Sequence, residues 1–326
     1  MDKKKIYFLR GITNSPFFNI ASEEYLLRQT DGYYIYLWIN SPAVIVGVNQ
    51  NTAEEVNLDY TAENGVKVVR RQTGGGAVYH DLNNVCYTII DDYDGERDNY
   101  RYFTEGITDY LGTLGVKAEF SGRNDLVVDG KKISGNAQCV YKKRMMHHGT
   151  LLFDTDAAAL TCALKPHRLK AESKGIKSAR ARITNISEHL PQKMTTAEFF
   201  EGLAAYFSKT AEPREFTADD IRAINALVKE KYSTFGWNVG ASPSAKFTAE
   251  KKFPYGLVQI NFGVEEGRLK DVKIYGDFFS VKDINPLNHA LNGILYKREA
   301  IEKALCGVGE CVVGSTPREI AEMFFE

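Results

Sequence analysis

The chain has 326 residues, of which 44% are hydrophobic and 25% are charged, and its formal net charge is −1. These values are ordinary for a globular protein, and the length accommodates one large domain and a smaller one. A nearly neutral chain lacks the global positive field that drives nonspecific nucleic-acid binding, so we expect no nucleic-acid partner. Any anion site must therefore come from local clustering of charge.

The cysteine pattern and the hydropathy indicate the compartment. The five cysteines are sparse and none forms a C-x-x-C pair, which argues against a disulfide framework and for a reducing environment. The basic N-terminal residues are not followed by an apolar signal segment, and no apolar run approaches the ~20 residues of a membrane span. We therefore expect a cytoplasmic protein without a membrane partner.

The first half of the chain alternates helical and strand-like patterns. Residues 19–30 predict a helix that Asn19 can cap. Runs rich in β-branched and aromatic residues predict strands at residues 33–39, 43–48, 66–69 and 85–90. Residues 100–115 predict a helix that ends at Gly115.

The second half changes character near residue 240. Helical patterns at residues 195–209 and 217–232 precede a loop-like stretch, and an alternating pattern typical of a β-meander and two helical patterns follow it. We predict a linker near Ser242 to Lys246, which divides residues 1–243 from a small α+β domain at residues 247–326.

Residues 68–81, VVRRQTGGGAVYHD, place two arginines before three consecutive glycines. The pattern is neither a Walker A loop nor a Rossmann fingerprint, because the required lysine and third spaced glycine are missing. Three glycines let the backbone approach a ligand closely and can present amides to an anion, although a plain turn explains them equally well. Neighbours on a strand face opposite sides, so at most one of Arg70 and Arg71 should reach a ligand directly.

Residues 124–135 predict a β-hairpin with a type I′ turn at Asp129 and Gly130. A two-residue turn pairs Val128 with Lys131, Val127 with Lys132, Leu126 with Ile133 and Asp125 with Ser134. Asp125, Lys132 and Ser134 then share a polar face that suits the wall of a ligand site. A solvent-facing hairpin is the alternative.

Two further stretches carry candidate residues. His147 and His148 point to opposite sides of a strand, and no zinc-binding spacing occurs, so we predict no metal site in the protein itself and keep only His148 as a candidate. Residues 165–186 are locally basic, which is typical either of a solvated face or of a loop that closes over phosphates.

Four segments resemble lipoate–protein ligase A in order and approximate spacing, and they are RRQTGGGAVYHDLNN, GRNDLVVDGKKISGNAQ, HHGTLLF and KGIKSARARITN. NIASEEYLL and VIVGVNQN fit the same pattern, so that the resemblance spans roughly residues 14–186. The C-terminal part is similar to the accessory domain of the long bacterial form. One departure is Gln72-Thr73, where family members often carry serine before the glycines.

The resemblance implies an α/β (α+β) fold, in which a biotin/lipoate protein ligase-like catalytic domain with mixed β-sheets flanked by helices precedes the accessory domain. It implies ATP-dependent activation of free lipoate to lipoyl-AMP, with Mg²⁺ bound through the nucleotide phosphates. The lipoyl group then passes to a lysine of an acceptor, which is a lipoyl domain of a 2-oxoacid dehydrogenase E2 subunit or the glycine-cleavage H protein. We expect a monomer.

The resemblance, the hairpin face and His148 together give the candidate site residues. Lys132 is expected to be catalytic. ATP contacts are expected at Arg71, Gly76, Ala77, Val78, Tyr79 and Lys132. Lipoate contacts are expected at Arg70, Gly74, Gly75, Gly76, Asp125, Lys132, Ser134 and His148. An adenylate-binding loop is expected at Lys174, Gly175, Lys177, Ser178, Arg180 and Arg182.

Two other functions remain open. An octanoyl or lipoyl amidotransferase of the same fold would use a cysteine nucleophile and no ATP, but Cys86 and Cys139 lie in apolar runs typical of buried structural cysteines. A non-catalytic lipoate-binding protein would bind the ligand without releasing AMP. A biotin ligase is disfavoured because its G-R-G-R-x-x-R type loop is absent.

Overall fold

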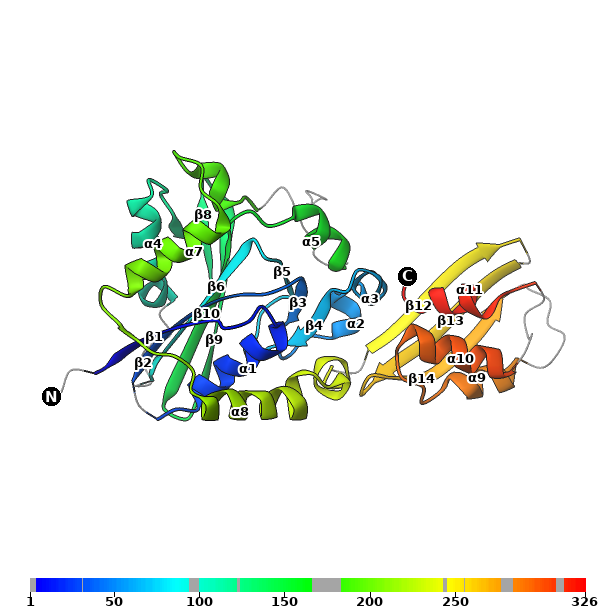
Figure 1. The fold of residues 1–326 in the computed structure, drawn as a ribbon. Coiled ribbons are helices and arrows are strands. Elements are labelled where there is room, and N and C mark those ends of the chain that lie inside the picture. Colours follow the sequence, from blue (N-terminus) through cyan, green and yellow to red (C-terminus); the bar gives the residue numbers. More distant parts are fainter. Residues whose placement is uncertain are drawn as a thin grey trace.

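The computed structural model describes residues 4–30, 32–93, 100–121, 124–165, 183–242, 245–254, 256–276, 284–308 and 314–326. Figure 1 shows two units, a larger one built around a twisted sheet with helices on both sides and a smaller one at the C-terminal end. The mixed α/β architecture predicted from the sequence is confirmed.

The large unit contains an eight-stranded sheet and a three-stranded sheet. In spatial order the strands of the first are β11 (Glu212–Pro213), β1 (Ile6–Arg10), β2 (Tyr33–Ile39), β6 (Asn84–Asp92), β10 (Arg144–Leu152), β9 (Lys131–Tyr141), β8 (Asp125–Val128) and β7 (Glu119–Ser121). The second sheet orders β4 (Lys67–Arg70), β3 (Ala43–Val46) and β5 (Val78–His80). Parallel pairs join β1 to β2, β1 to β11 and β3 to β4, and the other neighbours are antiparallel.

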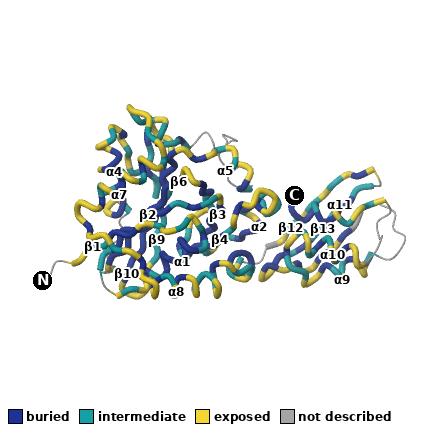
Figure 2. The backbone as a smooth tube through the Cα atoms, in the orientation of Figure 1, coloured by how far each residue is buried: buried dark blue, intermediate teal, exposed yellow. Residues whose placement is uncertain are grey.

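Both faces of the large sheet are buried under helices. The side chains of strand β2 alternate between the two faces. Ile35 and Leu37 enter the core under α4 (Tyr100–Thr113) and α7 (Thr196–Phe207). Tyr36 and Trp38 enter the core under α1 and α8. Helix α1 spans Pro16–Leu27 and α8 spans Ala218–Leu227. Figure 2 shows the buried strands between these two layers.

Short elements complete the large unit. They are α2 (Thr52–Glu55), α3 (Leu58–Glu63), α5 (Ala157–Ala163), the 3₁₀ turn η2 (Ile186–His189) and the π-helical turns η3 (Val228–Tyr232) and η4 (Gly236–Gly240). Turn η4 leads to the C-terminal unit, whose first strand begins at Ala245.

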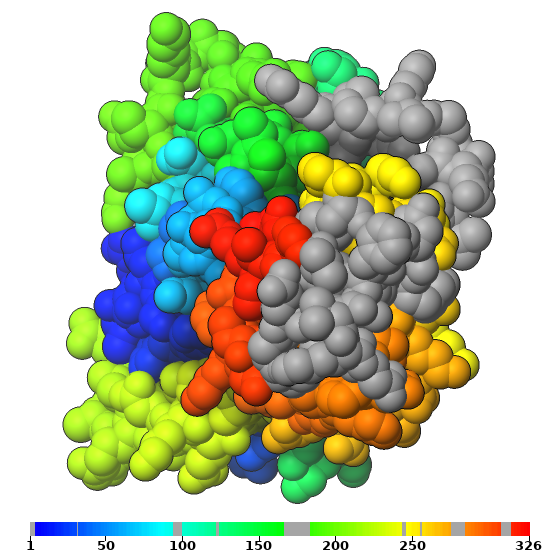
Figure 3. Space-filling model, turned by 90° about the vertical axis from the view of Figure 1, so that its right-hand side faces the viewer, coloured from blue at the N-terminus to red at the C-terminus, as the bar shows by residue number. Residues whose placement is uncertain are grey.

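The small unit is a β-meander covered by helices, as its alternating sequence predicts. Its strands are β12 (Ala245–Phe253), β13 (Gly256–Glu265) and β14 (Arg268–Gly276), and its helices are α9 (Asn285–Leu291), α10 (Arg298–Val308) and α11 (Pro317–Glu322). Its core includes Ala53 of the large unit, and Arg298 forms an ion pair with Asp59. Figure 3 shows α11 beside the segment that contains α2 and α3.

Two local predictions need correction. The first helix begins at Pro16 and is capped by Ser15, whose Oγ accepts from the amide of Phe18 at 3.4 Å. Asn19, the expected cap, is instead buried and donates to Asn40 Oδ1 at 2.9 Å. The end of the helix near Gly115 is confirmed, because Gly115 has a φ of +81° just after α4.

Within the described residues, no helix has the length and apolarity needed to cross a bilayer.

Candidate active site

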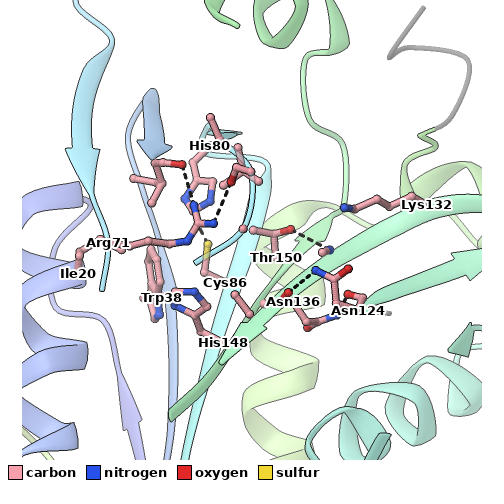
Figure 4. Close-up of a pocket in the computed structure, with 18 residues that line it drawn as sticks. Ile20, Trp38, Arg71, His80, Cys86, Asn124, Lys132, Asn136, His148 and Thr150 are labelled. Atoms are coloured by element: carbon pink, nitrogen blue, oxygen red, sulfur yellow. Dashed lines mark hydrogen bonds between the residues drawn. The ribbon is translucent and has the colours of Figure 1, made fainter. Parts of the chain in front are cut away.

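A cavity of about 140 Å³ lies between the loop that contains the three glycines and the wall formed by β9 and β10. Its polar lining comprises Arg71, Asn124, Lys132, Asn136, His148 and Thr150, together with the backbone at Gly75, Gly76, Gly135 and Gly149. Its other lining residues are Ile20, Trp38, Ile45, Ala77, Val78, His80, Cys86 and Ala137. Figure 4 shows Lys132 and Arg71 extending toward this space from opposite sides.

The predicted hairpin places Lys132 at the cavity. Asp129 and Gly130 have φ values of 50° and 74°, as a type I′ turn requires. Lys132 Nζ lies 2.8 Å from Asp125 Oδ1, so the two residues share a face as predicted. Gly135 permits this arrangement, because a Cβ there would lie 2.7 Å from Lys132 Nζ. The lysine ammonium therefore crosses the strand above a glycine and enters the cavity.

A β-bulge changes the base of this hairpin. Val127 pairs with Lys132 as predicted, but the register then shifts, so that Leu126 opposes Ser134 and Asp125 opposes Gly135. Ser134 is thereby fully buried, and its Oγ accepts from Asn136 Nδ2 at 3.3 Å rather than lining the cavity. The predicted lipoate contact by Ser134 does not fit this position.

Arg71 holds the glycine loop in place through hydrogen bonds. Its Nη2 donates to the carbonyls of Gly74 and Gly76 at 2.7 and 2.9 Å, its Nη1 to Ile45 O at 2.9 Å and its Nε to Thr73 Oγ1 at 2.8 Å. Burial lowers the pKa of the guanidinium to about 10, so it remains charged at neutral pH. Most of its donors are thus committed to the protein, and Arg71 shapes the loop at least as much as it faces a ligand.

The glycine loop itself exposes backbone to the cavity. Gly75 has a φ of +96°, which only glycine adopts without strain, and a Cβ there would meet Arg71 Nη2 at 3.0 Å. The positions at which Gly74 and Gly76 would carry a Cβ have no neighbour within 4 Å. The amides from Gly74 to Ala77 donate no hydrogen bond to any other described residue. Of these, the amides from Gly75 to Ala77 lie at the cavity and form a surface suited to phosphate oxygens.

Arg70, a predicted lipoate contact, does not line the cavity. Its side chain leaves β4 on the side opposite to Arg71, as strand alternation requires, and is fully buried. Its guanidinium donates to oxygens of residues 47–52 and 237–242, including Gln50 O at 2.7 Å. A direct contact with lipoate does not fit this position.

Two other predicted contacts also point elsewhere. Gly74 is absent from the cavity lining, and its carbonyl accepts from Arg71. The Tyr79 side chain is buried with Val44, Val46 and Val56 in a separate apolar cluster. Any contact of Tyr79 with ATP would have to come from its backbone. By contrast, Gly76, Ala77 and Val78 all line the cavity, so the ATP contacts predicted for them fit their positions.

His148 belongs to a buried polar chain that links two opposite charges. Its Nε2 lies 2.8 Å from Thr73 Oγ1, which also accepts from Arg71, and its Nδ1 lies 2.8 Å from Glu23 Oε1. Thr88 donates to the same Glu23 oxygen at 2.6 Å. The arrangement fixes the His148 ring against the glycine loop. Glu23 was missed because the sequence placed it in an ordinary helical pattern.

The apolar end of the cavity contains a histidine that the sequence did not single out. His80 Nδ1 lies 3.1 Å from Asn40 Nδ2, and its ring lies 5.9 Å from that of Trp38. Because Asn40 Oδ1 accepts from Asn19, the Asn40 amide donates to Nδ1, which places the His80 proton on Nε2. Burial lowers the pKa of His80 to about 3, so the ring is neutral. Its position at the end of β5, four residues after Gly76 of the glycine loop, was the one available signal.

The cysteines near the cavity are poor nucleophiles. Cys86 lines it and lies 3.5 Å from His80 Nδ1, but burial raises the pKa of its thiol well above the usual value. Burial also raises the pKa of Cys139 to about 12. A thiolate is the reactive form, so neither residue is poised for attack at neutral pH.

The predicted adenylate-binding loop cannot be placed. Its candidates Lys174, Gly175, Lys177, Ser178, Arg180 and Arg182 lie outside the described residues. The described chain resumes at Ile183, which bridges to Lys132, and Thr184 N donates to Lys132 O at 3.0 Å.

Comparison with known proteins identifies the family. Residues 15–208 match the lipoyl protein ligase A/B catalytic domain, and residues 242–324 match the C-terminus of bacterial lipoate protein ligases. This chain belongs to the lipoate–protein ligase family. Lipoate-protein ligase LplJ of Bacillus subtilis is 44% identical over 303 residues, which cover 90% of this chain and 92% of that protein.

Solved lipoate–protein ligases have the same fold. A bi-partite lipoate protein ligase from Thermoplasma acidophilum, described with its E2 lipoyl domain, is 29% identical with a TM-score of 0.64, over 74% of this chain and 98% of that one. A lipoate-protein ligase A bound with ATP is 27% identical with a TM-score of 0.61, over 73% of this chain and 99% of that one. The present chain is accordingly an enzyme, a lipoate–protein ligase.

Proposed function

We propose that the cavity activates free lipoate with ATP to give lipoyl-AMP and pyrophosphate, and that the lipoyl group then passes to the side-chain amine of an acceptor lysine. One observation carries this assignment to the cavity. The ammonium of Lys132 and the loop organised by Arg71 meet in one space whose other end is apolar. Such a space suits a ligand with an anionic head and an aliphatic tail.

The first step brings two anions together. A lipoate oxygen attacks the α-phosphorus, the bond to pyrophosphate breaks, and pyrophosphate carries away the electron pair. Lys132 is placed to attract both the carboxylate and the α-phosphate, which offsets their repulsion, and the amides from Gly75 to Ala77, which donate to no other described residue, supply further donors. In the second step the acceptor amine attacks the acyl carbon and AMP leaves. The acyl carbon is then bound to nitrogen, and the amine has lost a proton.

The tail of lipoate would occupy the apolar end. Ile20, Trp38, Ile45 and Cys86 line that end and belong to the large core under α1. We further propose that the segment with Lys174, Gly175, Lys177, Ser178, Arg180 and Arg182 binds the adenylate. Its closeness in sequence to Thr184, which is hydrogen-bonded to the Lys132 backbone, supports this proposal.

Mg²⁺ fits this site through the nucleotide. Within the described ranges, no group of three His, Cys, Asp or Glu side chains is arranged to hold a metal ion. Mg²⁺ commonly binds phosphates together with one or two carboxylates. Asp125, a predicted lipoate contact, does not line the cavity, but its carboxylate is paired with Lys132, which does, and would supply a ligand of that kind. When bound, Mg²⁺ neutralises phosphate charge.

We also propose the biological setting. The acceptors are lipoyl domains of 2-oxoacid dehydrogenase E2 subunits or the glycine-cleavage H protein, and the bi-partite relative described with its E2 lipoyl domain supports the former. The enzyme acts in the cytoplasm as a monomer, with no nucleic-acid or membrane partner. Its catalytic domain comprises residues 1–243 and its accessory domain residues 247–326.

Mass spectrometry of a purified E2 lipoyl domain tests the proposal. Incubation with the full chain, lipoate, ATP and Mg²⁺ should add one lipoyl group to the acceptor and release AMP. Modification that persists without ATP would indicate an amidotransferase instead. Tight lipoate binding without AMP release would indicate a non-catalytic binding protein.

A further inference from the structure

Arg70 is a fully buried cation whose neighbours are neutral. Its Nη1 donates to the carbonyls of Gly47, Val48 and Gln50 at 3.0, 3.1 and 2.7 Å. Among the described residues no carboxylate forms an ion pair with it. Burying a charge is costly unless it is hydrogen-bonded, so this guanidinium depends on the carbonyl oxygens that surround it.

The same guanidinium also binds the segment that leads to the C-terminal unit. Nε donates to Trp237 O at 3.0 Å, and Nη2 donates to Ser242 Oγ at 2.8 Å. The Arg70 backbone contributes as well, since its amide donates to Asn238 Oδ1 at 2.9 Å and its carbonyl accepts from Trp237 Nε1 at 2.8 Å. Residues 237–242 are therefore fastened to the end of β4, just before β12 begins at Ala245.

The carbonyls that Arg70 holds on its other side belong to a segment packed on the glycine loop. Val48 N donates to Thr73 O at 2.9 Å. A Cβ on Gly47 would lie 2.2 Å from Gly75 O, so the two backbones are in direct contact there. Residues 47–50 thus lie between the glycine loop and residues 237–242. Arg70 hydrogen-bonds to both residues 47–50 and residues 237–242.

We propose that Arg70 is a positioning residue, which holds residues 47–50 and 237–242 together and thereby fixes the glycine loop of the cavity without contacting the ligand. The adjacent arginines at the end of β4 then act on the glycine loop from two sides, since Arg71 donates to its carbonyls directly and Arg70 holds residues 47–50, which pack against it. The inference depends on the proposed function only for the identity of the ligands, lipoate and ATP.

Arg70→Lys in the full chain is the first test, because lysine keeps the charge but loses the planar fork of five donors. Amide hydrogen exchange, followed without ligand, should accelerate in residues 72–78 and 237–242 together. Affinity for lipoate and ATP, measured by calorimetry, should fall about tenfold or more. Arg144→Lys is the matched control, since Arg144 is also buried but pairs with Asp92 at the far end of the sheet.

The control separates positioning from loss of stability. Arg144→Lys should lower the melting temperature without changing exchange in either segment or the ligand affinity. The inference is overturned if Arg70→Lys leaves exchange in residues 72–78 at the wild-type rate, or if both variants lower affinity equally. Because exchange is measured on the free protein, it tests Arg70 even if the wild-type chain shows no ligase activity, which would refute only the proposed function.

Ser242→Ala is a milder second variant for the case in which Arg70→Lys does not fold. Ser242 does not line the cavity, and its hydroxyl accepts from Arg70 and from Thr52 N at 3.0 Å. Its removal should accelerate exchange in residues 72–78 by a few-fold, because it removes one of the acceptors that Arg70 uses. Exchange that changes only in residues 237–242 would contradict the inference.

Discussion

Removal of the Lys132 ammonium should abolish activation of lipoate while leaving the fold intact. Lys132 and Asp125 have side chains that are 34% and 36% exposed, so their ion pair falls in the surface class. Such pairs contribute at most ~1 kcal/mol. Lys132→Ala should therefore change the free energy of unfolding by no more than about that amount, as measured by urea denaturation.

The effect on catalysis should be much larger. If Lys132 attracts both the carboxylate and the α-phosphate, loss of this charged contact in a closed site removes ~3 kcal/mol of transition-state stabilisation, or about 10²-fold in rate. Pyrophosphate release with lipoate and ATP measures this step without an acceptor protein. The defect should appear there and not only in acceptor modification.

Lys131→Ala provides the matched control. Lys131 is the preceding residue on the same strand, but it is exposed and does not line the cavity. Its removal should leave the rate of pyrophosphate release unchanged. Near wild-type release by Lys132→Ala, or equal losses in both variants, would refute the role assigned to Lys132.

Three further predictions concern residues around the cavity. Cys86→Ala should retain pyrophosphate release within about fivefold, because it removes ~1 kcal/mol of packing and no nucleophile; abolished activity would favour a thioester mechanism. Tyr79→Phe should leave ATP affinity unchanged by calorimetry, since its ring lies outside the cavity. His80 has a pKa of about 3 in the folded chain against 6.5 ordinarily, so the unfolded chain binds more protons between these values and stability falls as pH drops from 6.5 toward 3, by ~1.4 kcal/mol per pH unit. His80→Gln should reduce the loss of stability between pH 7 and pH 5 in urea unfolding, and an unchanged loss would show that His80 is protonated in the folded chain.

Periodicity predicted the elements better than it predicted their ends. The strand at 33–39 is present with those bounds because every residue of β2 is apolar or aromatic. The first helix starts three residues earlier than predicted, since Ser15 followed by Pro16 provides a better start than Asn19. The side chain of the buried Asn19 instead makes four hydrogen bonds, with Thr13 O, Ile39 O, Asn40 Oδ1 and the Tyr36 hydroxyl. The partners in other elements are invisible in the local sequence.

The alternation of side chains along a strand predicted part of the site, but the prediction failed where a β-bulge interrupts the strand pairing. It correctly put Lys132 beside Asp125 and correctly separated Arg70 from Arg71. It misplaced Ser134, because a one-residue bulge reverses the face of every residue beyond it. Gly135, which lies in β9 directly after Ser134, was the one local signal for the bulge, because an isolated glycine inside a strand often marks one. Glu23 was missed for a different reason, since it touches His148 through a contact between elements far apart in sequence.

The charges around the cavity suggest how it can bind anions and also release them. Arg71 and Glu23 are both buried and are joined through Thr73 and His148, so their fields largely offset each other at a distance. Attraction for phosphate and carboxylate then comes from backbone amides and from Lys132, which a carboxylate already contacts. Preorganised dipoles stabilise developing charge without holding a product anion as strongly as several fixed cations would. A ligase must release both pyrophosphate and AMP in each cycle. It benefits from a site in which Arg70 and Arg71 hold the backbone in place, while the ammonium of Lys132 contacts the substrates directly.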